Sequence, residues 1–252
     1  MAVPSVLAVE TAALTAWPGL HTAYDGHWVW RAARGYSNRA NSIQCLDATD
    51  DANAADRIAH FSELFVRQGL RPICKVSPLT APGILAVLDE LMWEAYEPSR
   101  VLRMEMTGRE WEPRHHTALL APADPEWRLA QAGMSGYSDY SIESVRLIIE
   151  RIACDTRGVL AYDKDGVPAA AALAGVANGI GIFGNVVSSP AHRGQGYGRA
   201  VMCAALNWCR DAGAVAAGIQ VAAPNRPAVT LYGSLGFADG YDYSYRRPRI
   251  AA

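Results

Sequence analysis

Apolar residues recur at intervals of three and four along several stretches of the chain, a spacing that predicts amphipathic helices. Ile58, Phe61 and Phe65, for example, share one face of the first such stretch. Shorter apolar or mixed runs beside these stretches predict strands. In the first part of the chain, the predicted elements are strands at residues 40–46, 73–76 and 101–106 and helices at residues 56–68 and 82–93.

The second part of the chain contains a longer series of elements. Lys164, Asp165 and Gly166 form a turn signal between two apolar runs, which predicts a β-hairpin. The predicted strands are residues 158–162, 167–174, 180–187, 215–221 and 241–245, and the predicted helices are residues 143–153, 199–211 and 227–235. Strands and helices that follow one another in this way predict an α/β fold with a mixed sheet.

Residues 107–123 separate the two series. This stretch is rich in proline, histidine and charged residues and shows no sustained apolar period. We therefore interpret it as a linker between an N-terminal domain, residues 1–106, and a C-terminal domain, residues 124–252. A chain of 252 residues is long enough for two small domains.

Charge and cysteine content narrow the possible partners. The formal net charge of −2 gives no reason to expect nucleic acid or an anionic membrane as a partner. The sequence contains no run of about 20 apolar residues that would span a bilayer and no recognisable secretion signal, so we expect a cytoplasmic protein. The five cysteines lack metal-ligand spacing; we expect them to be small core residues, and we expect no bound metal.

A glycine-rich loop lies between a predicted strand and a predicted helix. Gly194, Gly196 and Gly198 alternate there, which lets successive backbone N–H groups point the same way at the start of the helix. Such a helix start favours a bound phosphate. The loop lacks the Lys-Ser/Thr of a Walker loop and the G-x-G-x-x-G spacing of a Rossmann loop. The residues alone therefore indicate a pyrophosphate site, or a loop that only packs a helix against a strand.

Two segments resemble motifs of the GNAT superfamily of N-acetyltransferases. Residues 192–199, His-Arg-Gly-Gln-Gly-Tyr-Gly-Arg, are similar to its motif A, Gln/Arg-x-x-Gly-x-Gly/Ala. Residues 225–237 are similar to its segment Asn-x-x-Ala-x-x-Leu-Tyr-x-x-x-Gly-Phe. The resemblance covers about residues 124–247. It implies an acyl-CoA N-acyltransferase fold, acetyl-CoA as cosubstrate, and transfer of the acetyl group to an amine.

The resemblance also implies roles for individual residues. The backbone of Val186, Val187 and Ser188 is expected to contact the pantetheine arm of the cofactor. The residues expected at the pyrophosphate are Arg193, Gly194, Gln195, Gly196, Tyr197, Gly198 and Arg199. Asn225 is expected to contact the cofactor, and Tyr232 is expected to be the catalytic residue that faces its sulfur. Considered alone, Asn225 also predicts a helix N-cap and Tyr232 a core aromatic residue.

The general base is not evident. The strand at residues 180–187 carries no acidic residue, and Gln220 on the next strand cannot accept a proton. The remaining candidates are Asp139, Glu143, His192, Asp239 and Asp242. Deprotonation at pH 7 costs nearly 5 kcal/mol for a lysine-like amine but about 1 kcal/mol for an α-amine, so a site without a base favours amines of lower pKa. We therefore expect the primary amine of a small molecule as acceptor. The alternatives are a protein N-terminus or lysine, and a non-catalytic acyl-CoA-binding module.

The N-terminal domain lacks both motifs. Its order of elements is similar to the back half of the GNAT fold, which implies a tandem protein whose first copy is degenerate. Residues 28–39 are dense in aromatic residues and arginines. They are candidates to line an acceptor pocket, with guanidinium groups for a carboxylate or phosphate, or to form a surface hairpin whose tryptophans pack on the sheet. We expect one CoA per protomer, in a monomer or homodimer.

Overall fold

The computed structural model describes residues 3–249. The elements of the first part are α1 (Val6–Ala16), β1 (His21–Asp25), β2 (Trp28–Ala32), the 3-10 helix η1 (Asn38–Ala40), β3 (Ser42–Cys45), α2 (Ala54–Arg67), β4 (Cys74–Val76), α3 (Pro82–Glu90) and β5 (Glu94–Glu105). Those of the second part are β6 (Thr117–Leu120), α4 (Pro125–Ser135), α5 (Asp139–Ile149), β7 (Asp155–Tyr162), β8 (Pro168–Ala177), β9 (Ile180–Ser188), the 3-10 helix η2 (Pro190–His192), α6 (Tyr197–Asp211), β10 (Ala216–Ala222), α7 (Arg226–Ser234) and β11 (Ala238–Arg247).

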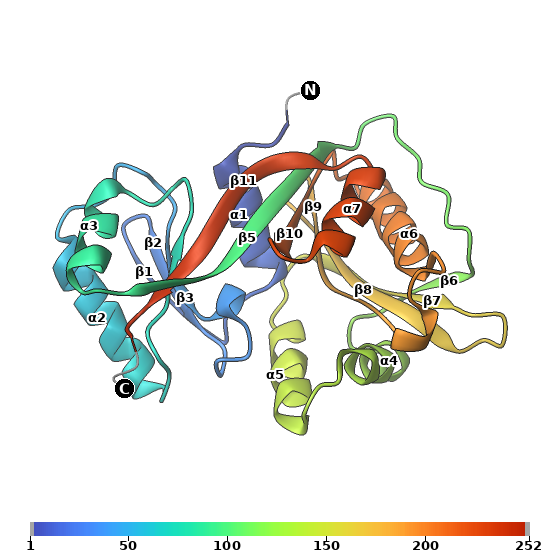
Figure 1. The fold of residues 1–252 in the computed structure, drawn as a ribbon, viewed down its shortest axis with the longest axis horizontal. Coiled ribbons are helices and arrows are strands. Elements are labelled where there is room, and N and C mark those ends of the chain that lie inside the picture. The colour runs from blue at the N-terminus through green and yellow to red at the C-terminus, as the bar shows by residue number, and fades with distance from the viewer. Residues whose placement is uncertain (1–2, 250–252) are drawn as a thin grey trace.

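All strands of the described residues belong to one mixed sheet, with helices on both faces (Figure 1). The strand order is β1-β2-β3-β4-β11-β5-β10-β9-β8-β7-β6. The pairs β3–β4 and β9–β10 are parallel, and the other neighbouring strands are antiparallel. This architecture confirms the predicted α/β class with a mixed sheet.

The first part buries its own aromatic core. Trp28 and Trp30 of β2 lie under α2, where the ring of Trp28 is 6.4 Å from that of Phe61 and the ring of Trp30 is 5.3 Å from that of Phe65. The apolar residues whose three-and-four spacing predicted α2 therefore form the helix face that covers this end of the sheet.

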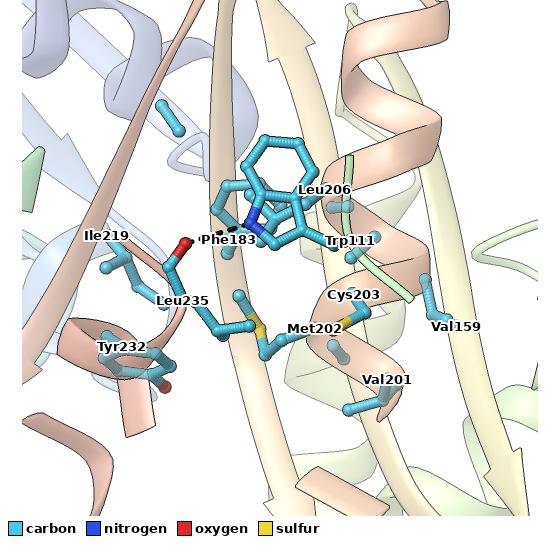
Figure 2. Close-up of a cluster of buried hydrophobic side chains, with 14 of the residues drawn as sticks. Trp111, Val159, Phe183, Val201, Met202, Cys203, Leu206, Ile219, Tyr232 and Leu235 are labelled. Atoms are coloured by element: carbon cyan, nitrogen blue, oxygen red, sulfur yellow. Dashed lines mark hydrogen bonds between the residues drawn. The ribbon is translucent and has the colours of Figure 1, made fainter. Parts of the chain in front are cut away.

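In the second part, neighbouring residues of β8 face opposite sides of the sheet, as the strand period requires. Ala172 lies in the core beneath α6, whereas Ala171 and Leu173 lie in the core covered by α4 and α5. Figure 2 shows the core beneath α6, where Trp111 of the β5–β6 connection donates its indole N–H to the Leu235 carbonyl across 2.9 Å.

The final strand joins the two parts of the chain. β11 lies between β4 and β5, with Tyr245 opposite Lys75 on one side and Tyr96 on the other. β5 in turn pairs with β10 of the second part. The division into domains at residues 107–123 stays a prediction, although that stretch contains β6 and the buried Trp111.

The sequence patterns did not predict five elements of the structure, which are α1, β1, β2, α4 and β6. In addition, β5 begins several residues earlier than predicted. α1 is rich in alanine, with Val9 and Ala12 both fully buried, so no clear polar face contrasts with an apolar stripe. No helix within residues 3–249 has the length and apolar character needed to cross a membrane.

Candidate active site

The strands β9 and β10 pair only over their first residues and then separate. Their parallel register ends at Phe183 opposite Ile219, after which β9 pairs only with β8 and β10 only with β5. Between Gly184 and Val187, two residues of β9 face one residue of β8, and Asn185 there has φ of 51°. This is a β-bulge, which ends regular pairing and redirects the strand. It leaves the backbone of β9 without a strand partner on the side toward β10.

A cavity of about 670 Å³ opens at this separation. Its wall combines the end of β9, the end of β10, α7, β5, β11 and the connection before β3. The lining residues are Gly35, Tyr36, Ser37, Asn38, Arg39, Glu97, Ser99, Tyr137, Phe183, Gly184, Asn185, Val186, Ile219, Gln220, Val221, Ala222, Asn225, Tyr232, Tyr243 and Tyr245. Both parts of the chain therefore contribute to one cavity of a size that suits a small ligand.

The glycine-rich loop forms the turn between η2 and α6. Gly194 and Gly196 adopt left-handed backbone conformations, with φ of 74° and 90°. The first N–H groups of α6 have no carbonyl partner within the helix. A Cβ atom at Gly194 would meet nothing within 4 Å, so the loop is open on that side. These features fit a bound diphosphate.

Side chains on two sides fix this loop. His115 Nε2 lies 2.9 Å from the Gln195 carbonyl oxygen, and its ring lies 4.0 Å from the buried Tyr197 ring. His192 hydrogen-bonds Asp163 at 3.1 Å. Backbone N–H groups, first that of Val167, hold the pKa of Asp163 below its usual value. The Tyr197 side chain is therefore an anchor, and its backbone is the part available to a ligand.

The loop also lies directly against the end of β9. A Cβ atom at Gly198 would lie 3.1 Å from Ser188 Oγ, so no larger residue fits there without displacement. Arg199 Nη1 donates to Ser234 Oγ across 2.8 Å and connects α6 to α7. The residues predicted for the pantetheine arm and for the pyrophosphate are thus adjacent. Together with the open side of β9, they fit an extended chain that ends in a diphosphate.

Asn225 and Tyr232 both lie in the cavity wall. Asn225 is the N-cap of α7, and its side-chain oxygen accepts from the Ala228 N–H at 3.3 Å. The N-cap prediction is therefore confirmed, and the cavity also has access to this residue. Tyr232 is 5% exposed, packs against Phe237, and still lines the cavity. Burial raises the pKa of Tyr232 to about 12, and the charge of Arg39 opposes this rise.

The five candidates for the general base lie outside the cavity lining. Asp239 and Asp242 are exposed and face Arg100, and Glu143 is paired with Arg146. Asp139 is exposed at the start of α5, and His192 is bonded to Asp163. Gln220 does line the cavity, where it accepts a hydrogen bond from the Tyr243 hydroxyl at 3.2 Å.

Sequence reasoning missed one acidic residue of the cavity. Glu97 lines it and accepts a hydrogen bond from Asn38 Nδ2 at 2.8 Å. Glu97 has φ of 49° and precedes Pro98, at the point where the β5–β11 register shifts. A proline within a strand is typical of such an irregularity. Pro98 lies before the strand predicted at residues 101–106, so the sequence contained no signal for Glu97.

For residues 28–39 the sequence predicts either the lining of an acceptor pocket or a surface hairpin whose tryptophans pack on the sheet, and the two ends of the segment differ in this respect. Trp28 and Trp30 pack in the core beneath α2, on a strand that is buried rather than on the surface. Residues 35–39 line the cavity. Among residues 3–249 no group of three or more histidine, cysteine, aspartate or glutamate side chains is placed to hold a metal ion.

Comparison with known proteins agrees with the resemblance to N-acetyltransferases found in the sequence. Residues 5–246 match the family model described as "Probable histone acetyltransferase Rv0428c C-terminal". The match includes the first part of the chain as well as the segment that resembles GNAT motifs. A Bacillus subtilis (strain 168) protein described as "Uncharacterized N-acetyltransferase YobR" is 26% identical over 246 residues, which cover 96% of this chain and 98% of that protein.

Solved structures share the fold over nearly the whole length. A GCN5-related N-acetyltransferase from Kribbella flavida has a TM-score of 0.71 at 19% identity and covers 98% of this chain and 97% of its own. A tandem GNAT protein from the clavulanic acid biosynthesis pathway has a TM-score of 0.65 at 13% identity, with 100% and 91% covered. The chain belongs to the family described as "Probable histone acetyltransferase Rv0428c C-terminal" and is an N-acetyltransferase of the GNAT superfamily.

Proposed function

We propose that the protein transfers the acetyl group of acetyl-CoA to a primary amine of a small molecule, by direct attack in a ternary complex. The observation that carries this proposal is the shared cavity. It joins the open end of β9 and Tyr232 to a wall built by residues 35–39 and Glu97 of the first part. A cavity whose wall is completed by the first part of the chain suits a small acceptor better than an extended peptide.

Acetyl-CoA would supply the activated acyl group, with its diphosphate at the loop from Arg193 to Arg199 and its arm along Val186–Ser188. In this arrangement a backbone N–H at the end of β9 would polarise the carbonyl that the amine attacks. Fixed donors of this kind stabilise the charge that develops on the oxygen.

Tyr232 would donate a hydrogen bond to the leaving sulfur. With a pKa of about 12 the phenol is protonated throughout the physiological range. Full proton transfer to a thiolate of pKa about 8.5 would be uphill by roughly 5 kcal/mol. Tyr232 therefore acts as a hydrogen-bond donor, and solvent completes the protonation.

Glu97 is the carboxylate that lines the cavity, and we assign it to the acceptor amine. Glu97 is exposed, and its carboxylate accepts a hydrogen bond from Asn38 Nδ2. In this role it takes the ammonium proton directly or through water before attack. In this role Glu97 would supply the acidic group that the strands near the phosphate loop lack.

A protein or peptide amine is the competing acceptor, since the matched family is described by a histone acetyltransferase. An acetyl-CoA-dependent thiol-release screen separates the two, with amino acids, polyamines, amino sugars and basic peptides compared under the same conditions. We expect turnover on one class of small amines, with a product heavier by one acetyl group and with little turnover by Tyr232→Phe. Turnover on peptides alone would reject the small-molecule acceptor, and turnover on no amine would reject the transfer.

A further inference from the structure

Arg39 is the positively charged residue in the wall of the main cavity. Of the described residues that line it, only Arg39 and Glu97 carry charged side chains. A Cβ atom at Gly184 would lie 3.7 Å from Arg39 Nη1, so the guanidinium lies beside β9, immediately before the bulge. Its charge opposes the rise that burial causes in the pKa of Tyr232, which places it within electrostatic range of that phenol.

Within residues 3–249 Arg39 has no carboxylate partner, and its guanidinium makes no hydrogen bond. Two acidic residues that share a pocket lining with Arg39, Glu97 in this cavity and Glu10 in a small separate pocket, are already engaged. Glu10 is bonded to Lys75, and Glu97 is bonded to Asn38. A guanidinium presents five N–H donors in a planar fork that matches a carboxylate. The Arg39 Cζ atom lies 5.9 Å from the centre of the Trp17 ring, a contact that leaves the N–H donors free. Arg39 therefore offers free N–H donors to an anion.

The other arginines of this segment have different tasks. Arg31 is buried and donates to the carbonyl oxygens of Trp17 and Arg39. Arg34 stacks on the Tyr140 ring at 4.5 Å and does not line the cavity. The bond from Arg31 fixes the backbone of Arg39, so the Arg39 side chain enters the cavity from a rigid support.

The expected diphosphate lies too far away to be the partner of Arg39. Gly184, beside Arg39, lies four positions before Ser188, which lies beside the phosphate loop. At about 3.3 Å per residue this distance is roughly 13 Å. Asn185 Nδ2, between these two points, is buried and has no partner among the described residues. The free donors therefore extend from the phosphate loop into the acceptor side of the cavity.

We propose that Arg39 binds a carboxylate of the acceptor, so that the acceptor is an amino acid or another small amine that carries a carboxylate. The inference rests on the proposed function and specifies its substrate class. A single guanidinium neutralises a monoanion, whereas Glu97 in the same cavity disfavours a doubly charged phosphate. With the carboxylate at Arg39, the amine of the acceptor points toward Val186 and Tyr232.

The test compares matched acceptors for each of three side chains: leucine, phenylalanine and lysine. Each set contains the free amino acid, its primary amide and the decarboxylated amine, and the leucine set adds the aminophosphonate. kcat/KM is measured for the wild type, Arg39→Met and Arg39→Lys, with Arg34→Met as the matched control. Binding of the N-acetyl amino acids to the CoA complex is measured by calorimetry, together with the affinity of each variant for CoA.

We expect Arg39→Met to lower kcat/KM for the preferred amino acid by about 10- to 100-fold relative to its amide, mostly through KM. Arg39→Lys should recover part of this loss, and Arg34→Met should behave as the wild type. CoA affinity should not change. Equal losses on all amines, a loss of CoA affinity, or a preference for the phosphonate would overturn the carboxylate assignment.

The two proposals fail in different ways. If neutral amines are acetylated without any Arg39-dependent preference for the carboxylate in any set, the acetyl transfer stands and the anion site is rejected. If no amine is acetylated but N-acetyl amino acids bind to the wild type and not to Arg39→Met, the anion site stands and the proposed function is rejected.

Discussion

Lys75 Nζ lies 2.5 Å from Glu10 Oε2 in the interior of the protein, with only 3% and 2% of the two side chains exposed. Glu10 also accepts a hydrogen bond from the Tyr241 hydroxyl at 2.7 Å. Burial lowers the pKa of Lys75, and the charge of Glu10 opposes this effect. The pair therefore ties α1, β4 and β11 together behind the cavity.

Removing one member of this pair should destabilise the fold. We expect Lys75→Met to lower the free energy of unfolding by about 3–5 kcal/mol, because it leaves a buried carboxylate without its counter-ion. The double variant Glu10→Gln, Lys75→Met should lose less than the sum of the single variants. Urea denaturation measures the free energy of unfolding of each variant, with the exposed Lys164→Met as control. If Lys75→Met costs no more than Lys164→Met, the pair does not stabilise the structure.

A negative charge at the glycine-rich loop should weaken CoA binding. Gly194 is the suitable position because its Cβ would meet no neighbour, whereas a Cβ at Gly196 would lie 3.2 Å from His115. We expect Gly194→Asp to lower CoA affinity at least tenfold, since the carboxylate repels the diphosphate. Gly194→Asn carries the same backbone strain without the charge and should lose much less. Equal affinities of the two variants in calorimetry would place the diphosphate elsewhere.

Tyr232 should affect turnover rather than cofactor affinity. Phe keeps the ring packed on Phe237 and removes only the hydroxyl, so Tyr232→Phe should lower kcat by about 10- to 100-fold. Because the pKa of Tyr232 is raised to about 12, the phenol stays protonated as the pH rises. The kcat of the wild type should therefore show no loss assignable to Tyr232 up to pH 10. A descending limb near pH 10 that Tyr232→Phe abolishes would contradict this environment.

The C-terminal part should not fold alone. In a fragment of residues 124–252, β7 loses β6, β10 loses β5, and β11 loses both β4 and β5. We expect this fragment to lack a cooperative unfolding transition, because three strands expose unpaired edges. Circular dichroism during heating measures the cooperativity of the fragment's unfolding, with the full chain as reference. A stable fragment that acetylates the same acceptor as the full chain would show that the first part is dispensable.

Sequence patterns located the local features of the site. The alternating glycines, Asn225 and Tyr232 are each recognised from their neighbours in the chain. The structure places Asn225 and Tyr232 in the cavity wall and the glycine loop against Ser188 at the end of β9. Glu97 could not be found in the same way, and the sequence did not distinguish Arg39 from the other arginines of residues 28–39, which were candidates to line an acceptor pocket. The place of Arg39 and Glu97 in the cavity depends on β11, which inserts between β4 and β5 and brings the two parts together. The insertion of the last strand between two strands of the first part leaves no periodic signal in the sequence.

Initial-rate kinetics with both substrates test the central claim most directly. CoA release is measured while acetyl-CoA and the amine are varied together, and the product mass is determined. Direct attack in the shared cavity predicts intersecting double-reciprocal lines, a product heavier by one acetyl group, and no acetylated protein when the amine is omitted. Parallel lines with an acetylated protein, or CoA release that does not depend on the amine, would contradict the account.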